Sequence, residues 1–429
     1  MKQKVLIVTY YWPPAGGPGV QRWLKFVKYL TEMGVQPWVF IPKNPNYPMV
    51  DTSLSTEVPE GIKVVEQPIW EPYQLASFFS ANKTKRISSG IIRDNKKQSF
   101  LERAMLWVRG NLFIPDARKY WVGPTVQRLT SLLQEENIHT LITTGPPHSL
   151  HLIGLRLKSR LDIQWLADFR DPWTGIGYHK KLKLSSFADR KHRSLEKKVL
   201  QNADTIITTS DTTTKAFQLM TSKPVVTITN GFDHATPEVS LDKQFTIAHI
   251  GSLLTDRNPK ILWEVLSELI HEIPDFKTTL QLRLIGVVGS EVWAALKAYG
   301  LEPYVENLGY VAHQSVLRYQ AQSQVLLLLE IDSEETQGII PGKLFEYLRA
   351  QRPILAIGPK EWEAGMRVEQ HKAGCFISAT QKELLKKVLV EWYKKYQKQQ
   401  LYCEPYNTEQ YHRKALTERL RKLLTWESF

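Results

Sequence analysis

Short apolar runs of strand length alternate along the chain with longer segments whose apolar residues recur at helical spacing. In the first half, these runs lie at residues 5–9, 37–41, 140–144, 164–167 and 205–209. Residues 20–33 form a typical intervening segment, with apolar side chains three and four positions apart. Nearly continuous apolar strands indicate a parallel sheet buried on both faces, so this half is predicted to be a doubly wound α/β domain.

The same alternation starts again at residue 245 and predicts a second α/β domain. Its strands are expected at residues 245–250, 279–285, 305–308, 325–329 and 354–357, with helices at 258–273 and 290–299. The boundary between the two domains is predicted near residues 230–244. The last segment, residues 382–426, is highly charged and is predicted to be almost wholly helical.

Composition sets limits on the class of protein. A chain of 429 residues suits two domains of about 200 residues each. The apolar run at the N-terminus is too short for a signal peptide, and no run is long enough to predict a transmembrane helix. Two cysteines are too few for a disulfide framework or a metal site and fit a reducing compartment, so a cytoplasmic location is expected.

The formal net charge of +13 predicts attraction to acidic partners such as nucleotide phosphates or anionic lipid. Two basic clusters occur at residues 83–97 and 180–198. The first precedes residues 100–115, where Trp107, Leu112 and Phe113 are interspersed with arginines. That mixture suits a membrane surface, although a solvated helix face with an aromatic core contact explains it equally well. No nucleic-acid-binding motif is present, so no nucleic-acid partner is predicted.

Unusual residues of the first half follow predicted strands, where ligands of open α/β sheets bind. Gly16 and Gly17 lie in a glycine-rich turn whose backbone N–H groups suit an anion or a closely approaching sugar, and the alternative is an ordinary turn. Asp168, Arg170 and Asp171 place two carboxylates and a guanidinium after a later strand. They indicate either a functional site or an internal Asp–Arg salt bridge.

In the second half, the most informative segment is residues 338–358. An apolar run through Ile339 and Ile340 leads to a Pro-Gly turn, and a helix is predicted from Lys343 onward. A diphosphate at that helix start would have Lys343 as its counter-ion, and Glu346 would accept hydrogen bonds from ribose hydroxyls. The alternative is a surface ion pair. Arg257, ahead of another predicted helix, suits bidentate bonds to phosphate.

Several of these segments together resemble glycosyltransferase family 4, of the GT-B fold, and in particular its bacterial cell-surface polysaccharide enzymes. The resemblance is carried by residues 230–233, 251–257, 284–286, 308–311 and 343–346, in order and spacing. It implies two Rossmann-like doubly wound parallel-sheet domains facing a cleft. Residues 1–235 would bind the acceptor, residues 236–408 would bind the nucleotide-sugar donor, and a C-terminal helix at 409–429 would cross back to the N-terminal domain.

The resemblance also implies roles for individual residues. Arg257 stands at a position where the family has a lysine, and Ser252 stands where its motif has an arginine. Glu346 matches the second glutamate of the family's paired-glutamate motif, a ribose ligand, while Gly338 stands in place of the first glutamate. Arg170 stands where many members have a histidine near the reacting carbon. Arg257 and Lys343 are implied both to bind the donor and to act in catalysis, and Asp168, Arg170 and Asp171 are implied to act in catalysis alone. The other implied donor-binding residues are Gly16, Gly17, Gly251, Ser252, Val311, Gly338, Ile339, Ile340 and Glu346.

The implied reaction is transfer of a sugar from a UDP- or GDP-sugar to a hydroxyl of a glycan or lipid-linked acceptor, with retention at the anomeric carbon. No Asp-x-Asp pair occurs in the sequence, so no metal cofactor is expected. The expected location is cytoplasmic, with peripheral contact at the inner face of an anionic membrane. Two alternatives remain from the sequence: a nucleotide-sugar epimerase of the same fold, and a non-catalytic membrane-associated scaffold.

Overall fold

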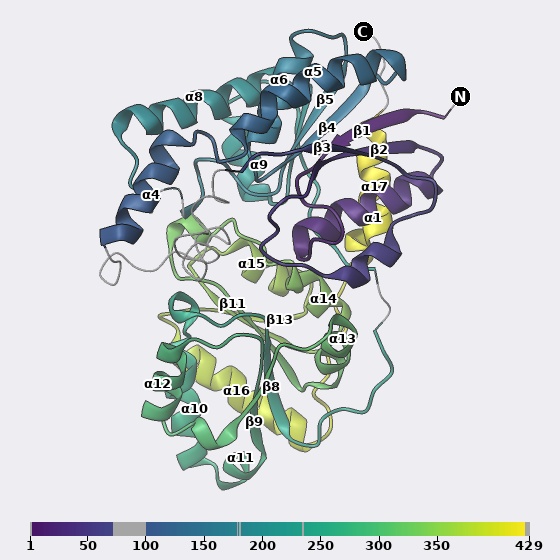
Figure 1. Ribbon diagram of the computed structural model, residues 1–429. Helices are drawn as coiled ribbons and strands as arrows, with labels where there is room; N and C mark the ends of the chain where they lie inside the picture. Colours follow the sequence, from purple (N-terminus) through teal and green to yellow (C-terminus); the bar gives the residue numbers. More distant parts are fainter. Residues whose placement is uncertain (1, 72–99, 178, 180–181, 234–235, 425–429) are drawn as a thin grey trace. The chain divides into compact units, whose positions relative to one another are not determined.

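The computed structural model describes residues 2–71, 100–177, 179, 182–233 and 236–424. Its contacts divide the chain into two compact units (Figure 1). Unit 1 comprises Met1–Asn230 together with Arg413–Phe429, and unit 2 comprises Gly231–His412. The first unit therefore ends at Asn230 rather than at residue 235, and the returning segment begins at Arg413 rather than at residue 409.

Unit 1 is built on a seven-stranded, fully parallel sheet in the order β3-β2-β1-β4-β5-β6-β7. The strands are β1 (Lys4–Val8), β2 (Gln36–Lys43), β3 (Lys63–Pro68), β4 (Thr140–Gly145), β5 (Gln164–Phe169), β6 (Thr205–Thr208) and β7 (Val225–Thr227). The pattern of apolar runs did not reveal β3 and β7. These are the two edge strands, and an edge strand buries less of its length than a central one.

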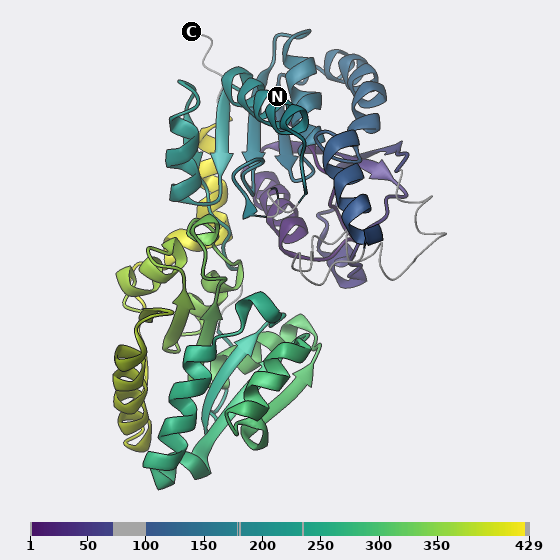
Figure 2. The ribbon, with the colours of Figure 1, turned by 90° about the vertical axis from the view of Figure 1, so that its left-hand side faces the viewer.

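The helices of unit 1 cover both faces of this sheet, as the two views in Figure 1 and Figure 2 show. They are α1 (Pro18–Glu32), α4 (Phe100–Leu112), α5 (Lys119–Glu135), α6 (Ser149–Lys158), α8 (Ser186–Asn202), α9 (Asp211–Gln218) and α17 (Arg413–Lys422), with a 3-10 helix η1 (Thr52–Glu57). Each face of the sheet packs in its own apolar cluster. Helix α17 lies beside α1, and its Leu416 and Leu420 share a cluster with Trp23.

Unit 2 repeats this architecture with a six-stranded parallel sheet in the order β10-β9-β8-β11-β12-β13. The strands are β8 (Phe245–Ile250), β9 (Leu280–Ile285), β10 (Val305–Gly309), β11 (Val325–Leu329), β12 (Ile354–Gly358) and β13 (Gly374–Ser378). The α-helices are α10 (Lys260–Glu272), α11 (Pro274–Thr279), α12 (Ser290–Ala298), α13 (His313–Gln322), α14 (Lys343–Arg349), α15 (Glu363–Gln370) and α16 (Lys382–Gln397). Four 3-10 helices complete it: η3 (Thr255–Arg257), η4 (Glu302–Tyr304), η5 (Glu334–Thr336) and η6 (Glu409–Tyr411). The predicted fold class, two Rossmann-like parallel-sheet domains, is confirmed.

The prediction that residues 382–426 are almost wholly helical was wrong. Helix α16 ends at Gln397, and the chain runs without an α-helix until α17 begins at Arg413. Contacts with distant residues hold this segment: Arg352 donates a hydrogen bond to the carbonyl oxygen of Leu401 at 2.8 Å, and the backbone N–H of Tyr406 donates to His371 at 2.8 Å. Such tertiary contacts override a local preference for helix.

Each sheet has one point at which the strand order reverses, and open α/β sheets bind ligands at the carboxyl ends of the strands there. In unit 1 this point lies between β1 and β4, and in unit 2 it lies between β8 and β11. In unit 2 the segment after β8 contains Ser252 and Arg257, and the loop after β11 leads to Lys343 at the start of α14.

Candidate functional site

In unit 2, two glycines allow the loops after β8 and β9 to pack backbone against backbone. Gly251 and Gly286 both have positive φ, +121° and +116°. A Cβ added to Gly286 would lie 2.8 Å from the carbonyl carbon and oxygen of Gly251, so a side chain there would displace the loop. Both positions therefore require glycine. The close packing exposes backbone at the carboxyl end of β8.

Lys343 begins α14 and reaches back to β8. Its Nζ donates a hydrogen bond to the carbonyl oxygen of Ile250 at 3.0 Å and lies 3.4 Å from Nε2 of His249. A Cβ built on Gly251 would lie 3.6 Å from the same ammonium. The structure thus places Lys343 at the carboxyl end of β8 beside Gly251, two residues that the sequence predicted to share a donor site.

Burial shifts the pKa of both titratable groups at this point, Lys343 and His249. Burial, followed by repulsion from Arg257, lowers the pKa of Lys343 to about 7, and attraction to Glu330 opposes that shift. Burial and the Lys343 charge lower the pKa of His249 well below its usual range, so this imidazole is neutral. Its Nδ1, 3.2 Å from the carbonyl oxygen of Leu327, is then the donor, and Nε2 accepts from Lys343.

Arg257, at the end of η3, forms a two-point ion pair with Glu330, the residue that follows β11. Nε of Arg257 donates to Oε1 at 2.9 Å and Nη2 donates to Oε2 at 3.1 Å. The Glu330 side chain is fully buried, while that of Arg257 is 39% exposed. Sequence reasoning missed Glu330. A single acid directly after a run of four leucines was the available signal, because a carboxylate at the end of a buried strand needs a partner.

The other predicted donor residues lie around this network. Glu346 accepts a hydrogen bond from Gln320 at 2.9 Å, and Ser252 is exposed next to Gly251. The loop of Gly338, Ile339 and Ile340 leads into α14, and Val311 follows β10. Contacts of the described residues join Gly251, Arg257 and Lys343 through β8 and Glu330. Val311 and Ile340 pack on the apolar cluster that contains Ile250.

In unit 1, the prediction of a direct catalytic role for Asp168 conflicts with its surroundings. The residue is fully buried and accepts hydrogen bonds from Nη2 of Arg22 at 2.9 Å, Nε1 of Trp23 at 2.8 Å and Oγ1 of Thr144 at 2.8 Å. Its carboxylate is thus fully occupied within the protein. The alternative interpretation, an internal Asp–Arg salt bridge, is correct, but the partner is Arg22 of α1 rather than Arg170.

Arg170 follows β5, and its side chain lies against the first turn of α1. It donates hydrogen bonds to the carbonyl oxygens of Gly145 and Pro146, and its guanidinium lies 5.7 Å from the ring centre of Tyr11. A Cβ on Gly19 would collide with it. Gly17 caps α1 with φ +102°, and the backbone N–H of Gly16 donates to Met49 at 3.0 Å. Gly16 and Gly17 therefore form the turn that brings the first turn of α1 to Arg170.

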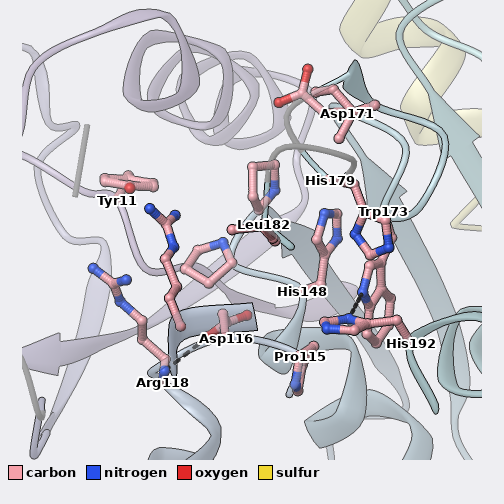
Figure 3. Close-up of a pocket in the computed structure, with 14 residues that line it drawn as sticks. Tyr11, Pro115, Asp116, Arg118, His148, Asp171, Trp173, His179, Leu182 and His192 are labelled. Carbon is pink, nitrogen blue, oxygen red and sulfur yellow. Dashed lines mark hydrogen bonds between the residues drawn. The ribbon is translucent and has the colours of Figure 1, made fainter. Parts of the chain in front are cut away.

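A cavity of about 360 Å³ opens in unit 1 at the carboxyl ends of β1, β4 and β5 (Figure 3). Besides Tyr11, Asp171 and Trp173, its lining includes three histidines, His148, His179 and His192. Figure 3 shows these three histidines and Trp173 gathered on one side, with Tyr11 and Arg118 on the other. Of the three predicted residues Asp168, Arg170 and Asp171, only Asp171 lines this cavity.

Most polar groups around the cavity are paired within the protein. Asp116 accepts hydrogen bonds from the backbone N–H and the hydroxyl of Ser149, both at 2.9 Å. Arg118 pairs with Glu71 at 3.0 Å. Nε1 of Trp173 donates to Nδ1 of His192 at 3.0 Å. Sequence reasoning missed the histidines, because they come from loops and helices that are distant in sequence.

The surface of α4 carries the exposed side chains of Trp107, Val108 and Leu112. Asn111 of α4 bonds to the backbone of Lys183 and Ser185, which brings α4 close to the start of α8, where Phe187 is also exposed. The basic cluster at residues 83–97 lies outside the described residues, as do Lys180 and Lys181 of the second cluster. In the described part of the chain, no helix is long and apolar enough to cross a membrane. Nor do three or more His, Cys, Asp or Glu residues gather there in a way that could hold a metal ion.

Comparisons with known proteins agree with this architecture. The family model described as Glycosyltransferase Family 4 matches residues 91–236. No curated protein sequence matches the chain. Among solved structures, HepE of Anabaena in complex with UDP and glucose superposes with a TM-score of 0.60 at 15% identity, covering 98% of this chain and 99% of that one.

Two further structures have the same fold. TarM of S. aureus, in complex with fondaparinux, α-GlcNAc-glycerol and UDP, has a TM-score of 0.55 at 11% identity over 99% of this chain and 100% of that one. A Listeria monocytogenes protein named as a UDP-N-acetylglucosamine 2-epimerase has a TM-score of 0.56 at 12% identity, covering 98% and 95%. At such identities the likeness shows the fold alone.

The chain therefore has the GT-B fold of these glycosyltransferases, and within it residues 91–236 match the model of glycosyltransferase family 4. The predicted resemblance to glycosyltransferase family 4 is thus confirmed over residues 91–236.

Proposed function

We propose that the protein transfers a sugar, with retention and without a metal ion, from a UDP- or GDP-sugar to a hydroxyl of a glycan or lipid-linked acceptor. The observation that carries this proposal is the pair of cationic side chains, Lys343 and Arg257, at the strand-order reversal of unit 2. Arg257 lies close enough to Lys343 for its charge to lower the pKa of Lys343. Two cations this close to each other favour the binding of a negatively charged ligand. A nucleoside diphosphate meets that requirement.

The diphosphate would bind where Lys343, Arg257 and the backbone after β8 come together. Lys343 and Arg257 would stabilise the charge that builds on the departing diphosphate in the transition state, which is the task a metal ion performs in other transferases. Two N–H groups of Arg257 are used by Glu330, and others remain for a phosphate oxygen. Glu346 would accept hydrogen bonds from the ribose. An oxygen of the departing diphosphate would assist removal of the acceptor proton.

The acceptor is assigned to unit 1, at the carboxyl ends of β1, β4 and β5, where Arg170, Asp171 and Tyr11 lie. A lipid-linked acceptor would require peripheral contact with an anionic membrane on the cytoplasmic side. The exposed Trp107, Val108 and Leu112 of α4, together with Phe187 and the basic side chains of α8, support that contact.

A screen of nucleotide sugars tests the donor assignment. A bound donor raises the melting temperature by mass action, so one UDP- or GDP-sugar should stabilise the protein without added metal and equally in EDTA. The same donor should then transfer its sugar to acceptors in a membrane extract, with the product analysed for retained anomeric configuration. Loss of donor binding in EDTA, or an inverted product, would contradict the proposal.

The epimerase alternative is favoured by the fold shared with the Listeria protein. Such an enzyme converts its donor to an isomer when no acceptor is present. Incubating the stabilising donor alone and resolving the sugars therefore separates the two activities. The scaffold alternative requires that no nucleotide binds, and the same stabilisation screen decides it.

A further inference from the structure

One side chain of the unit 1 cavity has hydrogen-bonding groups that the protein does not use. His148 is 4% exposed, and neither Nδ1 nor Nε2 has a partner within the described part of the chain. Its ring stacks on Trp173, with centroids 5.1 Å apart and planes 3° from parallel, so its orientation is fixed. Leaving a buried polar atom unpaired costs about 1–3 kcal/mol of free energy, so a ligand that forms hydrogen bonds with these nitrogens would bind favourably.

The charge state of His148 restricts that ligand. Burial, followed by repulsion from His151 and Arg170, lowers the pKa of His148 well below its usual range. The ring is therefore neutral, with one nitrogen that donates and one that accepts. A hydroxyl group, which also donates and accepts, complements either nitrogen.

The charged groups of the lining balance one another, because it contains two cations, Arg109 and Arg118, and two acids, Asp116 and Asp171. Asp171 lines the same cavity, and burial raises the pKa of its carboxyl, while the charge of Arg170 opposes that shift. The nearby cation Arg118 is already paired with Glu71. A carboxylate or phosphate in the cavity would meet a neutral imidazole and an acidic side chain, whereas a hydroxyl can bond to both.

We propose that this cavity binds a neutral sugar ring of the acceptor, with His148 contacting one hydroxyl and Asp171 another. That the sugar belongs to the acceptor rests on the proposed function. The binding of a neutral sugar in this cavity does not depend on it. A volume of about 360 Å³ lies at the lower end of the roughly 300–1,000 Å³ typical of ligand pockets, so only a terminal portion of a glycan enters. Tyr11 supplies aromatic surface for the sugar ring.

Binding of free sugars to the full chain tests this assignment. Saturation-transfer NMR with a panel of neutral methyl hexosides, 6-deoxyhexosides and N-acetylhexosaminides, alongside glucuronate and glucose 6-phosphate, measures which class binds. His148→Phe removes both nitrogens and keeps an aromatic ring on Trp173. Asp171→Asn is a second variant that does not alter this stacking. His139→Phe, at an exposed position of the same unit, is the matched control.

We expect at least one neutral glycoside to bind, with affinity at least tenfold weaker in His148→Phe and in Asp171→Asn and unchanged in His139→Phe. Binding of UDP or GDP should be the same in all four proteins. Preference for the charged sugars, no binding by any glycoside, or unaltered binding in a folded His148→Phe or Asp171→Asn would each overturn the assignment. If no nucleotide sugar is ever consumed but neutral sugars bind as described, the proposed reaction fails and the sugar site stands.

Discussion

Arg257 and Glu330, 73 residues apart in the chain, meet at two points across the strand-order reversal of unit 2, with N–O distances of 2.9 and 3.1 Å. The carboxylate is fully buried and the guanidinium is not. Glu330 also acts on Lys343, whose pKa it raises against the effect of burial. One carboxylate therefore orients one cation of the proposed diphosphate site and favours the charged form of the other.

Replacing Glu330 with Gln should weaken donor binding although Glu330 itself would not touch the donor. The change frees the Arg257 guanidinium and removes the charge that favours protonated Lys343. We expect kcat/KM for the donor to fall about 10- to 100-fold, chiefly through KM, as loss of roughly 1.4–2.8 kcal/mol would produce. Steady-state kinetics of Glu334→Gln, an exposed acid on η5, provides the control. A wild-type KM in Glu330→Gln would show that Glu330 does not support donor binding.

Replacing Lys343 or Arg257 with Ala should lower turnover by orders of magnitude. Each change removes a cation that the proposal assigns to the departing diphosphate, and loss of one such group typically costs about 10²- to 10³-fold in kcat. Lys260→Ala, at the exposed start of α10, should leave the rate unchanged. Near-normal rates in both Lys343→Ala and Arg257→Ala, measured in folded proteins at saturating donor, would refute the assignment.

Donor affinity should decline as the pH rises through about 7. Burial and Arg257 lower the pKa of Lys343 to about 7, far below its usual 10.5, so the free protein loses this positive charge above that pH. A bound diphosphate favours the protonated form, and Kd should therefore rise up to tenfold per pH unit above pH 7. Calorimetric titration with a nucleotide sugar between pH 6 and 9 measures the slope. Lys343→Arg, which stays protonated, should abolish the slope; a slope that persists in this variant arises elsewhere.

The stability of unit 1, rather than its chemistry, should depend directly on Asp168. Asn at this position would leave the Arg22 guanidinium, 2% exposed, without its counter-ion. Removing one partner of a buried pair costs about 3–5 kcal/mol of unfolding free energy. Urea denaturation followed by tryptophan fluorescence measures this loss, with Asp162→Asn at an exposed position as the control. If the Asp168→Asn protein were as stable as the wild type but inactive, the result would instead support a catalytic role for Asp168.

Part of this protein could be predicted from the order of residues alone. Apolar runs located the central strands of both sheets, and the residues after them located the loops that carry Gly251, Arg257 and Lys343. These features depend on neighbours in the chain, since the repeat of apolar positions reflects helix or strand geometry over a few residues. Three of the four edge strands, β3, β7 and β13, and the break between α16 and α17 were missed because partial burial and distant contacts determine them.

Pairing between distant residues was decided only in three dimensions. The neighbours of Asp168 come from α1 and β4, and the partner of Arg257 directly follows β11, because strand order and helix placement bring these elements together. The unpaired nitrogens of His148 likewise result from its packing among the rings of His151, Phe169 and Trp173, which no local pattern encodes. A carboxylate looks the same in a sequence whether it binds substrate or a buried arginine. Burial and the position of its partner make the difference.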